Sequence, residues 1–164
     1  MSRYTRLEQL GVALAQRFNQ IEMLAEDIAQ TFIFAFTQYL DAPADRIQAV
    51  TIDGDLNPVE VLATGKRPVV THGQDGLWYF GIQLTYGSTQ SFNWLTDQLL
   101  MSIKVDAPDA QSYQLGVAGG PLQIVSTPNE RETIFGNIFR TTEERLTRDF
   151  RVRTGFIGFT DIDR

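Results

Sequence analysis

Residues 77–86 read LWYFGIQLTY, and this stretch decides the fold. Its large apolar side chains alternate with other residues and therefore fall on one face: Trp78, Phe80, Ile82, Leu84 and Tyr86. A period of two is typical of a β-strand that has one face on a core. Gly87 interrupts the pattern. Tyr79 falls on the opposite face, and we expect it to be the more exposed aromatic residue.

Shorter strand-like runs lie on both sides of this stretch. We expect strands at residues 47–53, 59–64 and 69–72 before it, and at 98–105, 113–117 and 122–125 after it. Glycine, proline and aspartate mark the turns between them, as in GQDG at 73–76. Residues 91–97 are expected to form a short helix or a loop. Because the links are short, neighbouring strands should pair antiparallel.

Two helices are expected at the ends of this sheet. Residues 4–40 contain no proline, and their apolar residues recur at helical spacing. Residues 32–40 are apolar on nearly every side, which indicates a buried helix end. In the second helix, Thr127, Pro128 and Glu130 form a capping-box start. The tail at 155–159 could add one short strand.

The predicted fold class is α+β. We expect an antiparallel meander sheet of about six or seven strands with a long N-terminal helix and a C-terminal helix packed on it. Residues 1–164 fit one domain. In element order alone the chain resembles secretion-chaperone-like and profilin-like α+β folds, which also place terminal helices around an antiparallel sheet. No motif carries that resemblance to particular residues.

The N-terminal helix is too long for the domain. At ~1.5 Å per residue it would span about 55 Å, whereas a compact chain of this size is about 40 Å across. Either the helix bends near Gly11 or Arg17, or its first half projects. A projecting half would expose its apolar stripe, so we predict a partner-binding surface there, formed by Leu7, Leu10, Leu14, Phe18, Ile21, Leu24 and Ile28.

Composition narrows the class of protein. Apolar residues make up 43% of the chain, enough for a core and against general disorder. Without cysteine there is no disulfide and no thiolate site. The apolar run at 31–36 is too short to cross a bilayer, and the N-terminus does not resemble a signal peptide. We expect a cytoplasmic protein that does not associate with membranes.

A search for catalytic chemistry nominates no residue. His72 is the only histidine and is expected to be a turn residue. The run DGDLN at 53–57 has the oxygen spacing of a calcium loop, but Pro58 replaces the required glycine. Gly65-Lys66 lacks the rest of a phosphate-binding loop. No catalytic residue, metal ligand or cofactor is therefore predicted.

Arginines gather near the C-terminal end. They could bind an anion or nucleic acid, and the candidates are Arg140, Arg145, Arg148, Arg151 and Arg153. Ordinary helix-surface ion pairs are the favoured explanation, as with Glu144 four residues before Arg148. A net charge of −6 also makes nucleic acid an unfavoured partner.

Three functions stay open at this point. The first is a non-catalytic interaction module, a small subunit or an adaptor or chaperone-like component, which binds itself as a homodimer or another protein through the N-terminal helix. The second is a small-ligand-binding domain or enzyme with a pocket between sheet and helices. The third is an anion or nucleic-acid contact by the C-terminal arginines.

Overall fold

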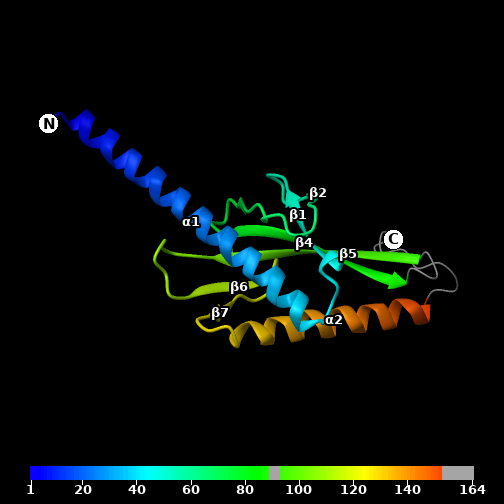
Figure 1. Cartoon of the computed structure of the whole chain (residues 1–164). Helices are drawn as coiled ribbons and strands as arrows, with labels where there is room; N and C mark the ends of the chain where they lie inside the picture. Colours follow the sequence, from blue (N-terminus) through cyan, green and yellow to red (C-terminus); the bar gives the residue numbers. More distant parts are fainter. Residues whose placement is uncertain (89–92, 153–164) are drawn as a thin grey trace.

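The computed structural model describes residues 1–88 and 93–152 of the chain, and it has an α+β fold (Figure 1). In chain order, a long N-terminal helix comes first, the seven strands of one sheet follow, and a C-terminal helix comes last. The elements are α1 (Arg3–Tyr39), a 3-10 turn (Ala44–Arg46), β1 (Ile47–Ile52), β2 (Pro58–Val61), β3 (Thr71–His72), β4 (Trp78–Ser88), β5 (Asn93–Lys104), β6 (Tyr113–Val117), β7 (Gln123–Val125) and α2 (Glu130–Val152).

All strand pairs are antiparallel, and the spatial order is β2-β1-β4-β5-β6-β7. The short β3 pairs with β4. Strands β4 and β5 form the spine, in register from Trp78 opposite Ile103 to Ser88 opposite Asn93. The predicted α+β class and antiparallel sheet are confirmed.

One sequence prediction in this region is wrong. Residues 93–97 are the start of β5, and not a short helix or loop. The reason is pairing with β4, which continues without a break from Leu84 opposite Asp97 to Ser88 opposite Asn93 and overrides the local preference of residues 93–97. Residues 91 and 92 lie outside the described residues, as does the tail at 155–159.

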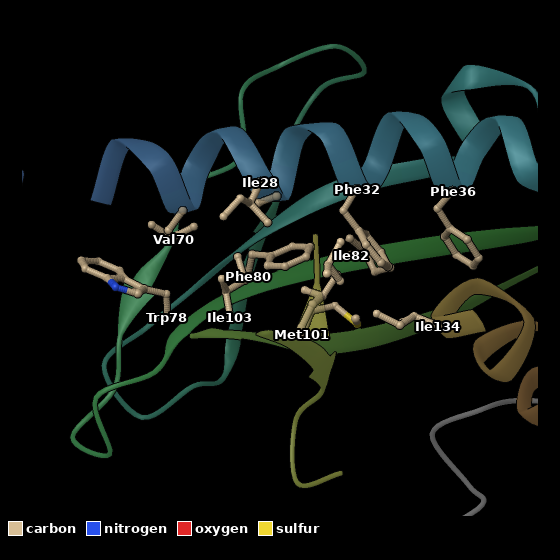
Figure 2. Packing of buried hydrophobic residues seen from close by; sticks show 14 of the residues in the cluster. Ile28, Phe32, Phe36, Val70, Trp78, Phe80, Ile82, Met101, Ile103 and Ile134 are labelled. Carbon is tan, nitrogen blue, oxygen red and sulfur yellow. The ribbon is translucent and has the colours of Figure 1, made fainter. Parts of the chain in front are cut away.

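The core lies between one face of the sheet and the two helices. Figure 2 shows Phe32 and Phe36 of α1 directed at the sheet, above Phe80, Ile82 and Met101. The ring centroids of Phe32 and Phe80 are 5.6 Å apart, and those of Phe32 and Phe135 are 5.2 Å apart. Because Phe135 belongs to α2, these contacts join both helices to the same core.

Helix α1 is continuous over 37 residues. The alternative in which the helix bends near Gly11 or Arg17 is therefore wrong. Its C-terminal half lies over the sheet, and its N-terminal half extends beyond the sheet (Figure 1). The expectation of a helix end buried on every side is also wrong, because Phe34 is 64% exposed on the outer side.

Helix α2 begins at Glu130, two residues after the predicted first position at Pro128, and the Glu130 half of the predicted capping box is present. The carboxylate of Glu130 accepts hydrogen bonds from the backbone N–H groups of Ser126 and Thr127, the latter at 3.1 Å. These bonds fix the two residues that lead into the helix, as the glutamate of a capping box does.

Tyr79 is buried rather than exposed, so that prediction is wrong. Its hydroxyl donates a hydrogen bond to the carboxylate of Asp75 in the turn before β4. The ring also covers Gly73, where an added Cβ would stand 2.6 Å from a ring carbon. The turn folds back over the tyrosine, and this contact could not be found from strand alternation alone.

Candidate protein-interaction surface

The N-terminal half of α1 exposes large apolar side chains. Residues 1–20 are all exposed, and burial begins at Ile21. Leu7, Leu10 and Leu14 are 66%, 58% and 69% exposed. Single exposed leucines are ordinary on a protein surface, but three on one side of a helix within two turns form a stripe that water disfavours.

This stripe continues the face that α1 turns toward its own sheet. The buried residues of the C-terminal half are Ala25, Ile28, Ala29, Phe32 and Phe36. With 3.6 residues per turn, the same line extends backward through Phe18, Leu14, Gly11 and Leu7, with Leu10 beside it. We call Leu7, Leu10, Gly11 and Leu14 the exposed seam. Its members lie on the core side of the helix, beyond the point where the sheet ends.

An aromatic cluster stands where α1 leaves the sheet. The ring of Phe18 lies 5.2 Å from that of His72 and 5.0 Å from that of Trp78, and His72 and Trp78 are 4.7 Å apart. The residue before Phe18, Arg17, donates a hydrogen bond of 3.5 Å to the backbone oxygen of Asp106. His72 therefore has a structural role as a packing partner of Phe18.

Arg67 fixes α1 to the body at a second place. Its guanidinium donates to Glu26 at 3.0 Å and to Asp27 at 2.7 Å. The same group donates to the side chain of Gln30 and to the backbone oxygen of Met23. Hydrogen bonds with Glu26 and Asp27 raise the pKa of Arg67 above its usual value. The helix is thus held on two sides before it leaves the sheet, and the exposed seam has a defined direction.

The structure divides the predicted partner-binding residues into two groups. Leu7, Leu10 and Leu14 are exposed, and Phe18 is partly exposed at the base of the projecting half. Ile21 and Leu24 are half-buried against the chain's own core, and Ile28 lies inside it. The surface available to a partner is therefore shorter than the predicted one.

Charge along α1 changes sign at the same boundary. The exposed half contains Arg3, Arg6 and Arg17 with a single acid, Glu8. The covered half contains Glu22, Glu26 and Asp27 with no basic residue. The tip that projects furthest from the body is thus basic, whereas the protein as a whole is acidic.

The predicted anion-binding arginines do not form one described patch. Arg145 donates a hydrogen bond to the buried carboxylate of Asp97, and Arg140 lies 3.6 Å from Glu144 on the helix surface. Arg148 and Arg151 belong to α2, but their side chains lie outside the described residues, as does Arg153 altogether. The two arginines that can be placed therefore pair within the chain.

Two cavities lie between the sheet and α2, and one of them includes the Asp97–Arg145 pair in its lining. One, of about 260 Å³, is lined by Asp97, Leu99, Ile138 and Thr141, among others. Burial raises the pKa of the Asp97 carboxyl, although Arg145 acts in the opposite direction. The other cavity, of about 390 Å³, has a mainly apolar lining that includes Phe36, Leu84, Tyr86 and Phe139. Burial, as the largest cause, raises the pKa of Tyr86 to about 12.

These cavities offer little that resembles a catalytic site. In the second, burial shifts the pKa of Tyr86 upward, which favours the protonated hydroxyl over a phenolate. In the first, the Asp97 carboxylate accepts a hydrogen bond from Arg145, so the two charged groups of the lining pair with each other. Within residues 1–88 and 93–152, no group of three or more His, Asp or Glu residues could hold a metal ion.

No protein-family model, curated protein or solved structure matches this chain. Among the helices that the structure describes, none is long and apolar enough to cross a membrane.

Proposed function

We propose that this chain is a non-catalytic protein-interaction module, a small subunit or adaptor that binds a polypeptide through the exposed half of α1. One observation carries the proposal: the helix face that buries Phe32 and Phe36 continues, in phase, into the exposed leucines of the seam. A helix with an apolar seam is stabilised when a second helix covers it.

The energies involved favour a modest affinity. Burying a leucine side chain completely contributes about 1.5–3 kcal/mol, and the three seam leucines are already about one third covered. Covering them therefore contributes about 3–6 kcal/mol per helix, whereas association costs about 4–15 kcal/mol in lost freedom. The seam alone supports a weak complex, so further contacts around it should set affinity and specificity.

The sheet edges are poorer candidates for the same role. The outer strands β2 and β7 contain only four and three residues. Strand β2 also contains Pro58 and Glu60, and proline and charge both discourage strand addition at an edge. The helix is therefore the better docking element.

Site-specific photo-crosslinking in the producing cells tests the proposal. Benzoylphenylalanine at position 10 in the seam should form a covalent adduct with a polypeptide. The same group at position 23, where Met23 is 61% exposed on the outer side of α1, is the matched control and should form none. The adduct from position 10 should disappear with the double change Leu7→Asp and Leu14→Asp. Equal yields at both positions, or none at position 10, would contradict the proposal.

A small-ligand pocket is a second candidate, favoured by the apolar cavity of about 390 Å³ between α1, α2 and the end of β4. Ligand sites of this kind commonly measure about 300–1,000 Å³. Thermal-shift screening with apolar small molecules would detect such a ligand. A stabilising compound should lose its effect in the variant Leu84→Trp, which fills the cavity from its wall.

A further inference from the structure

We infer that the exposed seam binds the same seam of a second copy of this chain, with the two α1 helices antiparallel and the two-fold axis between Leu10 and Gly11. This inference rests on the proposed function, in which α1 is a docking element, and it names the partner. Three features of the described residues support it: the spacing of the seam, the length of the exposed run and the distribution of charge.

The seam residues are spaced symmetrically about a point between residues 10 and 11. When the axis passes between residues 10 and 11, facing residues have numbers that add to 21. Leu7 then faces Leu14 of the other copy, and Leu10 faces Gly11. An added Cβ at Gly11 would find no heavy atom of the described residues within 4 Å, so this position leaves room for an incoming Leu10. The Leu10 side chain of one copy thus fits into the space beside Gly11 of the other, as in knobs-into-holes packing.

The exposed run has the length that this arrangement requires. Residues 1–20 are exposed, and the midpoint of that run is the proposed axis. Each exposed half would therefore be covered along its whole length by the other. The tip of one helix would end at the base of the other, where Arg3 of one copy faces the ring of Phe18. Phe18 is partly exposed there, and an arginine over an aromatic ring is a favourable contact.

Charge favours the antiparallel direction over the parallel one. The tip of α1 contains Arg3 and Arg6, and a parallel pair would place two such tips together. The end of the body where α1 leaves the sheet contains exposed Asp75, Asp106 and Asp109, in the turns that flank β4 and follow β5. An antiparallel pair brings each basic tip to the acidic end of the other copy.

The neighbouring groups at that end are consistent with this pairing. Arg17 already contacts the backbone oxygen of Asp106, which places this turn next to the base of the projecting half. Lys104 is also exposed near the turn, but it alternates with the core residue Ile103 and belongs to the sheet face away from the helices. With Arg17 counted against Asp75, Asp106 and Asp109, the base is acidic on balance toward an arriving tip.

Cysteine crosslinking distinguishes the two directions, and the absence of native cysteine makes it direct. Variants Leu7→Cys and Leu14→Cys should each stay uncrosslinked alone under mild oxidation and should form a disulfide-linked dimer when mixed. In an antiparallel pair, two copies of residue 7 stand about 10 Å apart along the axis, beyond disulfide reach. Crosslinking of each variant alone, with none between them, would show a parallel pair and overturn the inference.

Sedimentation equilibrium gives a second, independent readout that needs no cysteine. Reversing the tip (Arg3→Glu with Arg6→Glu) or the body end (Asp106→Arg with Asp109→Arg) should each weaken self-association about tenfold at low salt. Combining all four changes should restore association to within about threefold of wild type. Failure of the combined variant to recover would contradict the charge pairing.

The two proposals fail in different ways. A monomer at all concentrations, together with a photo-adduct of position 10 whose mass is not twice that of the chain, would overturn the self-pairing and leave the docking function intact. A monomer with no adduct at position 10 would remove both.

Discussion

The two halves of α1 differ in what covers them, although they share one helix and one apolar line. Residues 21–39 lie against the sheet and place Phe32 and Phe36 in the core. Residues 3–20 continue the same line beyond the sheet and expose Leu7 and Leu14. Helical periodicity is identical in the two halves, so the extent of the sheet, and not the helix sequence alone, determines where burial stops.

The difference has a consequence for how each half tolerates change. In the covered half, the buried positions hold small residues first, at Ala25 and Ala29, and large ones later, at Phe32 and Phe36. In the exposed half, the apolar side chains of Leu7, Leu10 and Leu14 are mostly open to solvent and add little to the fold of one copy. Substitutions in the two halves should therefore separate stability from association.

The largest expected effect comes from truncating one apolar residue in each half. Phe32→Ala removes a fully buried ring that contacts Phe80 and Phe135, and should lower the free energy of unfolding by about 3–5 kcal/mol. Leu14→Ala should change it by less than about 0.5 kcal/mol in dilute protein. Urea unfolding at submicromolar concentration measures both. A cost for Leu14→Ala near that of Phe32→Ala would mean that the seam is covered within one copy.

A smaller effect is expected at the contact that holds the covered half in place. Arg67→Ala removes the hydrogen bonds to Glu26, Asp27 and the backbone of Met23 and should cost about 1 kcal/mol, because the pair is partly exposed to solvent. The loss should shrink at high salt. Arg6→Ala in the exposed half is the matched control and should leave urea unfolding unchanged. Equal losses would show that both arginines act only through net charge.

Most of the architecture followed from local patterns that a single sequence contains. Strict alternation at 78–86 predicted β4, and Thr127 to Glu130 predicted the start of α2. The length of the proline-free run predicted that α1 would either bend or project beyond the sheet, and the structure shows that it projects. These signals depend on residues close in sequence, which is why they can be read without the fold.

The details of the site depend on contacts between distant residues. The predicted stripe includes Phe18, but the sequence does not show that this ring packs on His72 and Trp78, which lie 54 and 60 positions later. Arg67 follows a glycine turn and shows no periodic signal, yet it holds α1 to the body. Contacts between residues so far apart in the sequence can be found only when the folded sheet places those residues side by side.

The smallest expected effect has the opposite sign, and it concerns the middle of the exposed half. Gly11→Ala should stabilise the helix locally by up to about 1 kcal/mol, because alanine restricts the unfolded backbone and suits a helix interior. An added Cβ there meets no described atom within 4 Å, so no clash offsets this gain in one copy. Amide hydrogen exchange at residues 8–15 in dilute protein should slow about fivefold, while urea unfolding of the body stays unchanged.

Gly136 in α2 provides the control for that gain. An added Cβ at Gly136 would meet the Tyr39 hydroxyl at 3.5 Å, an ordinary contact, so Gly136→Ala should act on the whole fold through a helix that packs on the core. If Gly11→Ala instead hastened exchange in dilute protein, another part of the chain would have to lie against residue 11. Because the exposed half stands apart from the sheet, a change confined to residues 8–15 is the result that its geometry requires.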